Sequence, residues 1–314
     1  MKIAFIINGK IKKLNKVEQE IKSTFNTYTI ELYISSYAGQ MSALCKKAIE
    51  EQCTHFIFVG GDGTLNEGIN GIVDYFQLND NRNINDFDWH KIAQLKIGIY
   101  PAGSANDFVK TIYKNTTLQN IKSLIDNNSQ QLTDIGWVQY YNNNQQQSVR
   151  FFMNITDVGM GGETVKRKDA MPSWLGADIN YFWSITSTLA TYKNTSVQAF
   201  NDDFCWEGKV VNMVVANGKY FGNGLGVAPD AKVDDGLFSF IIIGDVSLGD
   251  YFKNLGTVKK CIKIDHPEVQ YHQFEKITIQ SSDKNIITID MDGEYIGNAP
   301  MTLQCLTQKV CFIR

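Results

Sequence analysis

Apolar and polar residues alternate in two different ways along this chain. Up to residue 130, short apolar runs with the length of buried strands are separated by segments whose apolar residues recur every three or four positions. The expected strands and helices, in alternating order, are residues 3–7, 43–51, 56–59, 65–76 and 97–100. This alternation predicts a parallel sheet wrapped by helices. Residues 79–89 predict a surface loop, and residues 118–125 predict one more short helix.

Beyond about residue 132, the chain changes to short strand-like segments separated by turn residues. These segments are residues 134–140, 150–155, 210–216, 237–243, 276–280, 286–290 and 301–307. Such spacing predicts an antiparallel β domain. The polar tract at residues 142–147 predicts a hairpin loop between two of the strands.

One predicted helix, residues 177–193, interrupts these strands. The residues that recur in it at helical spacing are Tyr181, Phe182, Ile185, Leu189 and Tyr192. A stripe of this kind predicts packing in the core, and a lipid-contacting face is the alternative. Asn180 and Ser184 interrupt the apolar residues, so the segment falls short of the roughly 20 apolar residues of a membrane-spanning helix.

Length and composition favour two folded domains and exclude disorder. The 314 residues are 43% apolar and 12% aromatic, with a formal net charge of −3. This composition provides enough buriable surface to offset the entropy lost on folding. We expect a first domain at residues 1–131 and a second at residues 132–299, and residues 300–314 are a candidate for packing back onto the first.

Charge and cysteine usage narrow the function classes. With 30 basic and 33 acidic residues, the chain shows no basic face for the phosphates of a nucleic acid. The six cysteines are scattered without a CxxC pair, as expected for reduced thiols. The apolar run at residues 3–7 is too short for the core of a signal peptide. We therefore expect a cytoplasmic protein, peripheral at most to a membrane.

The clearest chemical signal is the segment FIFVGGDGTLNEGINGI, residues 56–72. Its apolar strand, its turn at Gly60, Gly61 and Gly63 and its amphipathic helix describe a strand that turns sharply into a helix. Glycine lets the backbone take positive φ and approach a phosphate closely, and the free amides of a helix start favour an anion. The pattern favours a nucleotide phosphate site, with an ordinary strand-to-helix turn as the alternative.

Polar residues accompany these glycines. Asp62 can order a phosphate-bound Mg²⁺ or accept a hydrogen bond, and Thr64, Asn66 and Glu67 lie at the start of the expected helix. In the alternative interpretation, Thr64 is only a helix cap. The GK[ST] ending of a P-loop and the GxGxxG spacing of a dinucleotide turn are both missing. The chain must therefore use another phosphate-binding design.

A second loop, IGIYPAGSANDFVKTI at residues 97–112, repeats this logic. A buried strand turns at Gly103, and Ser104, Asn106 and Asp107 lie at a helix entrance. Loops at the carboxyl ends of parallel strands face one crevice, the usual ligand position in an open α/β sheet. The alternative is that Ser104 and Asn106 merely cap the helix.

Four ordered segments then resemble a known family. Residues 60–67 (GGDGTLNE) and 101–108 (PAGSANDF) are similar to segments of the diacylglycerol kinase catalytic domain, a family that includes bacterial soluble lipid kinases and the sphingosine and ceramide kinases. Residues 217–237, ending in Asp-Gly-Leu, and residues 289–297, containing Asp-Gly-Glu, continue the resemblance. The GGDGT segment alone is shared with NAD kinases and resembles a phosphofructokinase loop.

The resemblance implies an α/β nucleotide domain with a parallel sheet, similar to NAD kinase and phosphofructokinase, an antiparallel β-sandwich domain, and ATP in a cleft between them. The implied ATP-lining positions are Asn8, Gly9, Ser35, Gly60, Gly61, Asp62, Gly63, Thr64, Leu65, Asn66, Glu67, Gly103, Ser104, Asn106 and Asp107. Ser104 takes the place of the family's usual Thr, and Ser35 fills a hydroxyl position. The family's Asn-Pro-x-Ser-Gly segment survives here only as Asn8, Gly9 and Lys10.

Two acidic segments complete the candidate site. Asp292 and Gly293 predict a tight turn that presents Glu294, to which the resemblance assigns the role of general base beside a catalytic Asp62; a solvated hairpin acid is the alternative. Three acids precede a glycine at residues 230–236, and oxygen-rich turns suit a hard cation. The resemblance implies a structural Mg²⁺ held by Asp235 and the main-chain oxygens of Lys232 and Leu237, with a plain acidic turn as the alternative.

These features together predict a kinase that uses ATP and Mg²⁺ to phosphorylate a lipid hydroxyl at a membrane surface, in phospholipid biosynthesis. The alternatives are a kinase for a soluble substrate such as NAD, and a non-catalytic regulator that binds a nucleotide or a lipid. The choice of lipid and the formation of a homodimer stay open, because acyl-chain pockets consist of interchangeable apolar residues.

Overall fold

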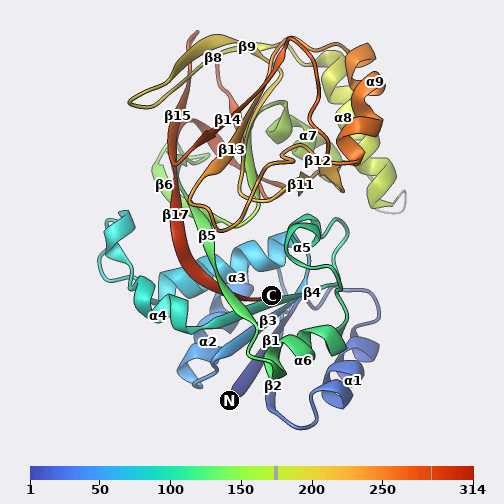
Figure 1. Ribbon diagram of the computed structural model, residues 1–314, viewed down its shortest axis with the longest axis vertical. Coiled ribbons are helices and arrows are strands. Elements are labelled where there is room, and N and C mark those ends of the chain that lie inside the picture. The colour runs from blue at the N-terminus through green and yellow to red at the C-terminus, as the bar shows by residue number, and fades with distance from the viewer. Residues whose placement is uncertain (173–175, 284) are drawn as a thin grey trace. The chain divides into compact units, whose positions relative to one another are not determined.

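The computed structural model describes residues 1–172, 176–283 and 285–314, and its chain forms two compact units (Figure 1). The first unit consists of Met1–Ile135 and Thr307–Arg314, and the second consists of Gly136–Leu306. Two long strands, β5 (Gln130–Tyr141) and β17 (Glu294–Ile313), contribute residues to both units.

The first unit is an α/β fold. Its other strands are β1 (Lys2–Ile7), β2 (Thr29–Ile34), β3 (His55–Gly60) and β4 (Lys96–Pro101). Its helices are α1 (Leu14–Thr24), α2 (Met41–Glu50), α3 (Asp62–Tyr75), η1 (Ile84–Asp86, a 3₁₀ turn), α4 (Trp89–Gln94), α5 (Asp107–Ile112) and α6 (Leu118–Asp126). The strands pair in parallel in the order β2-β1-β3-β4-β17, so the predicted parallel sheet is confirmed.

Both faces of this sheet are covered by helices, which explains the nearly continuous apolar runs of β1 and β3. On one face, Phe5 and Ile57 pack with Ile21 of α1 and Ile121 of α6. On the other face, α3 lies so close to β3 that a Cβ on Gly68 would be 2.0 Å from the ring of Phe58. This glycine is therefore needed for the close approach of helix and sheet.

Some elements of the first unit were missed by the apolar pattern. The edge strand β2 is only half-buried, so its apolar residues do not form a run. The predicted surface loop at residues 79–89 contains η1, a turn closed by Asn83 and Asp86, each of which accepts the backbone N–H of the other. This turn is formed by local capping hydrogen bonds, which a pattern of apolar residues does not indicate.

The second unit is antiparallel. Its strands, besides the two shared ones, are β6 (Gln147–Phe152), β7 (Ile155–Gly159), β8 (Thr195–Phe200), β9 (Cys205–Val210), β10 (Asn212–Ala216), β11 (Tyr220–Phe221), β12 (Leu225–Gly226), β13 (Phe238–Ile243), β14 (Val269–Phe274), β15 (Lys276–Ser281) and β16 (Thr288–Met291). Its helices are α7 (Met160–Asp169), α8 (Ala177–Thr191) and α9 (Leu248–Lys259). The strands form two ladders, β14-β13-β10-β7-β16-β17 and β9-β8-β15-β17.

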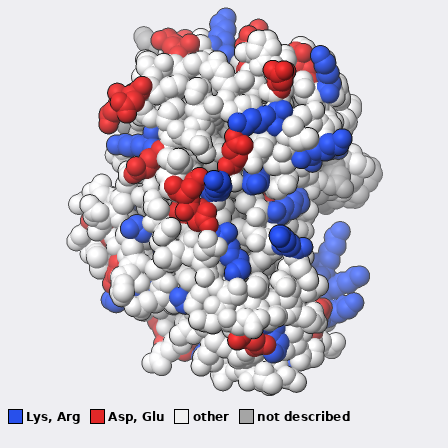
Figure 2. Space-filling view, viewed as in Figure 1, with Lys and Arg blue, Asp and Glu red and all other residues white. Residues whose placement is uncertain are grey.

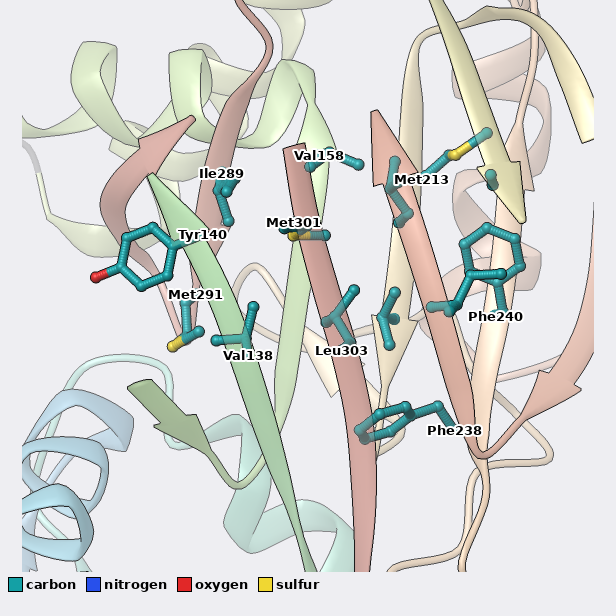
Figure 3. Packing of buried hydrophobic residues seen from close by; sticks show 14 of the residues in the cluster. Val138, Tyr140, Val158, Met213, Phe238, Phe240, Ile289, Met291, Met301 and Leu303 are labelled. Carbon is teal, nitrogen blue, oxygen red and sulfur yellow. The ribbon is translucent and has the colours of Figure 1, made fainter. Parts of the chain in front are cut away.

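Side chains from the strands of the second unit form its main core (Figure 3). Phe238 and Phe240 of β13, Met213 of β10 and Leu303 of β17 are fully buried in this cluster. Phe152 of β6 stacks on Phe238 with ring centroids 5.4 Å apart. The antiparallel sandwich predicted as the second half of the fold is confirmed.

Three predictions for this unit have clear outcomes. The polar tract after β5 is the predicted hairpin loop, since Tyr141 pairs with Gln147 across it. The segment expected as one strand at residues 150–155 holds the end of β6 and the start of β7, because Asn154 leaves the ladder and its carbonyl accepts the amides of Asn217 and Gly218. The core packing expected of the α8 stripe is wrong for Phe182, which is 44% exposed.

Candidate functional site

The strand order of the first unit creates a position where a ligand can bind. The chain passes from β1 through α1 to β2 on one side, and then through α2 to β3 on the other side of β1. The carboxyl ends of β1 and β3 therefore flank a topological switch point, which is where open α/β sheets bind ligands. Asn8 and Gly9 follow β1, and Gly61, Asp62 and Gly63 follow β3.

The loop after β1 is tied to both of its neighbours. The Asn8 amide donates to the Val59 carbonyl at 3.0 Å, and Asn8 Nδ2 donates to Thr64 Oγ1 at 3.3 Å. The Gly9 amide donates to Ser35 Oγ at 3.1 Å, and a Cβ on Gly9 would lie 2.1 Å from the Ser35 carbonyl oxygen. The structure thus brings together four of the predicted positions, which are Asn8, Gly9, Ser35 and Thr64. Only glycine fits at position 9.

The glycines after β3 permit close approach. A Cβ on Gly60 would lie 2.2 Å from Thr64 Oγ1, and one on Gly103 would lie 2.4 Å from the Gly61 Cα. None of the three glycines of this turn has a positive φ, so close approach is the reason for glycine here. The two predicted phosphate loops therefore touch at their glycines, and side chains would push them apart.

The start of α3 offers free backbone donors. The amides of Asp62 and Gly63 lack a partner among the described residues, whereas the Thr64 amide already donates to the Gly61 carbonyl at 3.0 Å. No side chain caps this end of the helix. Unsatisfied N–H groups at the start of a 14-residue helix are suited to an anion such as a phosphate. Leu65, which follows, is buried in the core.

Asp62 turns away from α3 and binds the neighbouring helix. Its Oδ2 accepts the Asp107 amide at 2.9 Å and its Oδ1 accepts the Phe108 amide at 3.0 Å. Burial raises the pKa of Asp62 above its usual value, the charge of Asp107 adds to this, and the two amides oppose it. Asp107 itself pairs with Lys110 at 2.6 Å. Asp62 thus caps α5 and leaves the free amides of α3 to a ligand.

The second loop is closed by its own side chain. The Gly103 amide donates to Asn106 Oδ1 at 3.0 Å, and Asn106 Nδ2 donates back to the Gly103 carbonyl at 2.8 Å. Asn106 has a φ of 51° and makes no side-chain cap of α5, so the expected alternative of a simple cap does not describe it. Ser104 is exposed at the tip of the loop, where its hydroxyl is available to a ligand.

Two residues of the first motif have contacts within the fold. Glu67 Oε1 accepts the Met41 amide at 2.6 Å and so caps α2. Asn66 is 1% exposed, and its carbonyl accepts Asn70 Nδ2 at 2.8 Å. The Glu67 carboxylate would repel a phosphate. Its contact with the Met41 amide instead indicates a structural role as the cap of α2.

The hairpin that carries Glu294 lies in the second unit. Asp292 and Gly293 both have positive φ, at 50° and 83°, and Met291 pairs with Glu294 across them, so the predicted tight turn is confirmed. The Glu294 side chain is 46% exposed and pairs with Arg150 Nη2 at 2.7 Å. This contact spans 144 residues of sequence, and no local pattern signals Arg150.

Further cations surround this hairpin. Lys168 Nζ donates to the Gly293 carbonyl at 3.5 Å, and Lys166 Nζ lies 3.9 Å from the centroid of the Tyr295 ring. Both lysines belong to α7. Arg150 thus orients the Glu294 carboxylate, and the two lysines place positive charge near the hairpin, where negative charge on a reacting group could be stabilised.

The predicted metal segment forms a turn. Asp235 Oδ1 accepts the Leu237 amide at 3.2 Å, Gly236 between them has a φ of 77°, and Asp235 and Lys232 are exposed. Across the residues that the structure describes, no group of three or more His, Cys, Asp or Glu side chains is arranged to hold a metal. The predicted ligands are one carboxylate and two carbonyls, an oxygen donor set that suits Mg²⁺.

A pair of buried carboxylates was missed by the sequence analysis. Asp157 of β7 lies directly opposite Asp290 of β16, and the two residues are 0% and 7% exposed. Burial, followed by the charge of Asp290, raises the pKa of Asp157, and burial raises the pKa of Asp290 to about 7. An acid within the apolar strand β7 was the available signal, although its partner is far away in sequence.

Two known protein families match the chain, one over most of each unit. Residues 2–138 match the diacylglycerol kinase catalytic domain, and residues 155–314 match the YegS C-terminal NAD kinase beta sandwich-like domain. The chain belongs to the diacylglycerol kinase catalytic-domain family, which confirms the resemblance seen in its motifs and makes it a member of a kinase family.

Individual relatives agree with this assignment. The chain is 24% identical over 278 residues to a diacylglycerol kinase of Staphylococcus carnosus, covering 88% of this chain and 82% of the relative. It is 26% identical over 286 residues to one from Staphylococcus epidermidis, covering 90% and 81%. The crystal structure of a diacylglycerol kinase from Bacillus anthracis superposes with a TM-score of 0.68 at 18% identity, covering 99% of this chain and 96% of that one, and shows the same fold.

None of the helices in residues 1–172, 176–283 and 285–314 is both long and apolar enough to cross a bilayer.

Proposed function

We propose that this protein transfers the γ-phosphoryl group of ATP, bound as its Mg²⁺ complex, to the hydroxyl of diacylglycerol or a related lipid. The observation that carries the proposal is the Asp62 bridge. By accepting two amides of α5, Asp62 fixes the second glycine loop against the first and leaves the first amides of α3 free. The relatives that are named diacylglycerol kinases supply the choice of lipid.

The nucleotide-binding part of the proposal uses the loops after β1, β3 and β4. The free amides of Asp62 and Gly63 would bind phosphate oxygens, and the exposed hydroxyl of Ser104 would add a contact. Asn8, Gly9 and Ser35 would shape the opposite side of the loop, since Gly9 donates to Ser35 and Asn8 donates to Thr64. The glycines matter here because a Cβ would fill the space that the phosphates need.

The transfer step needs charge neutralisation and a proton acceptor. Glu294 would orient the lipid hydroxyl and accept its proton, while Arg150 holds the carboxylate in one direction. Phosphoryl transfer passes through a loose transition state, so charge neutralisation contributes more to the rate than the base does. Loss of the loop geometry fixed by Asp62 should therefore be at least as harmful as loss of Glu294.

Two bound cations fit the proposal. Mg²⁺ accompanies ATP and supplies charge neutralisation on the phosphates. A second, structural Mg²⁺ would be held by Asp235 and the carbonyls of Lys232 and Leu237, since all three provide oxygen donors in one turn. Such an ion would stabilise the segment between β12 and β13.

A kinase of NAD or another soluble alcohol is the second candidate. Its support is the match of residues 155–314 to a domain described as NAD kinase beta sandwich-like. The GGDGT segment is common to both classes and does not separate them.

A phosphorylation panel separates these functions. Purified protein with Mg²⁺ and labelled ATP is incubated with diacylglycerol, phosphatidylglycerol, sphingosine, ceramide and NAD in parallel. Label in a lipid product supports the proposal, label in NAD alone favours the second candidate, and ATP binding without any transfer indicates a regulator.

Variants link the activity to the site. Asp62→Asn replaces an acceptor of two amides by a side chain that can accept only one, and Glu294→Gln removes the proton acceptor but keeps the shape. Asp80→Asn, an exposed acid in the same unit as Asp62, is the matched control. We expect both site variants to lose at least tenfold in kcat and the control to lose nothing. Full activity in Asp62→Asn would show that the loop is misassigned.

A further inference from the structure

Helix α8 is amphipathic in the reverse of the usual sense. Its buried side chains are polar, since Asn180, Ser184 and Thr188 are 7%, 0% and 0% exposed. Its exposed side chains include Ile179 at 57% and Trp183 at 60%. A helix on the surface of a protein in water ordinarily buries its apolar face.

The outward apolar residues of α8 lie together. Ile179, Phe182 and Trp183 are spaced by three and four positions, so they share one face of the helix. The exposed apolar side chains therefore form one continuous patch on the helix, unlike the single exposed apolar residues that are scattered over the surface of any protein. We call these three residues, together with Phe252 of α9 and Ile262, the outer face.

Helix α9 runs beside α8 (Figure 1) and adds residues to the outer face. Phe252 of α9 is 48% exposed, and its ring lies 6.3 Å from that of Phe182. Ile262, shortly after α9, is 53% exposed. Helix α9 has no buried residue of its own, so little of it is used in the core. Half of the ten large apolar side chains found exposed in the described part of the chain thus belong to this one region.

Unpaired lysines accompany the outer face. Lys253 and Lys259 of α9, and Lys260 at its C-terminal cap, are exposed, and none of the described residues forms an ion pair with them. The acid of the same helix is engaged, because the Asp250 carboxylate accepts hydrogen bonds from the Ser247 amide and hydroxyl. In Figure 2, basic side chains show at the surface on the side of the second unit where α8 and α9 run in Figure 1.

We infer that the outer face docks on a lipid bilayer that contains anionic lipids. Aromatic and aliphatic side chains beside lysines are the composition of interfacial helices, whose apolar residues enter the boundary between headgroups and acyl chains. The unpaired lysines favour an anionic surface over a second copy of this chain, because two copies would bring like charges together. The polar residues under α8 keep its apolar side turned outward. The biological role of this docking rests on the proposed lipid kinase function, but the vesicle-binding test does not depend on that function.

The test measures vesicle binding without ATP. Vesicles of phosphatidylcholine with about 30% phosphatidylglycerol are sedimented with the wild type and with Phe182→Ser/Trp183→Ser. Removing two apolar anchors should weaken binding by at least about tenfold, because each large apolar side chain that leaves water on docking contributes to the affinity. The matched control is Leu78→Ser/Ile286→Ser, in which the replaced residues are 62% and 74% exposed and lie elsewhere. We expect the control to bind as the wild type does.

A charge variant tests the lipid preference. Lys253→Gln/Lys259→Gln/Lys260→Gln should bind anionic vesicles about as weakly as it binds vesicles of phosphatidylcholine alone. Thermal unfolding and circular dichroism confirm that each variant is folded. Equal binding by the wild type and the aromatic variant would overturn the inference, as would a dimer in sedimentation equilibrium that only the aromatic variant loses.

Activity assays then separate the two proposals. A short-chain diacylglycerol below its micellar concentration reaches the site without docking, so the aromatic variant should phosphorylate it as fast as the wild type and lose activity only on vesicles. Vesicle binding that is lost in the variant while the wild type phosphorylates no lipid would refute the proposed function and leave the docking face standing.

Discussion

Replacement of Asp290 by asparagine should stabilise the second unit at neutral and alkaline pH. In the wild type, Asp290 lies opposite Asp157 in the buried ladder between β16 and β7, and Asp157 Oδ1 and Oδ2 and Asp290 Oδ1 lack a hydrogen-bond donor among the described residues. Two carboxylates in such a place cannot both be ionised without a large cost. One proton held between them is the simplest way to satisfy the pair.

The magnitude follows from the raised pKa. Burial raises the pKa of Asp290 from 3.8 to about 7, a difference of about three pH units, which corresponds to about 4 kcal/mol. Because the pKa is higher in the folded state, the folded protein holds its proton while the unfolded chain releases it above about pH 4. The stabilisation is therefore present at low pH and is lost progressively as the pH rises from about 4 to about 7.

Asparagine cannot ionise, so Asp290→Asn should remove this loss. Chemical unfolding in urea at pH 5 and pH 8, followed by tryptophan fluorescence and circular dichroism, measures the free energy of unfolding of wild type and variant. We expect the variant to gain between about 1 and 3 kcal/mol at pH 8 relative to its effect at pH 5, because about two of the three pH units lie between pH 5 and pH 7. Asp203→Asn, an exposed acid of the same unit, is the control and should show no such difference. A wild-type stability that falls between pH 5 and pH 8 no more than that of the variant would refute the shared-proton account.

Three shorter predictions concern the site and its supports. Gly103→Ala places a Cβ 2.4 Å from the Gly61 Cα and should lower both the melting temperature and the affinity for ATP, as measured by thermal unfolding with and without nucleotide. Glu67→Ala removes the acceptor of the Met41 amide and should cost about 1 kcal/mol in urea unfolding without changing the KM for ATP. Arg150→Gln frees Glu294 and should lower kcat about tenfold with the KM for ATP unchanged; an equal rise in KM would place Arg150 at the nucleotide instead.

Local chemistry made the glycine loops predictable. The segment Gly60–Glu67 combines an apolar strand, glycines and a helix start within a few residues, and the structure has β3 and α3 at these positions. The hairpin at Asp292 and Gly293 was predictable for the same reason, because a type I′ turn needs two residues that tolerate positive φ. In both cases the residues that determine the structure are neighbours in sequence.

Contacts across long stretches of sequence were not predictable. Asp62 caps a helix that starts 45 residues later, so its capping role depends on the approach of two loops that the sheet brings together. Arg150 reaches Glu294 across 144 residues. Periodicity of 3.6 identifies a stripe on a helix but does not say which side is covered, and in α8 the polar side is the buried one. The elements that pack against the helix determine which of its sides is buried.

Hydrogen–deuterium exchange with and without ATP and Mg²⁺ tests the central claim most directly. The claim is that the amides at the start of α3 bind the phosphates of a nucleotide. We expect ATP to slow exchange in peptides covering residues 60–67 and 101–108 and to leave the hairpin loop at residues 142–147 unchanged. Saturating ATP that leaves exchange in residues 60–67 unaltered would contradict the account.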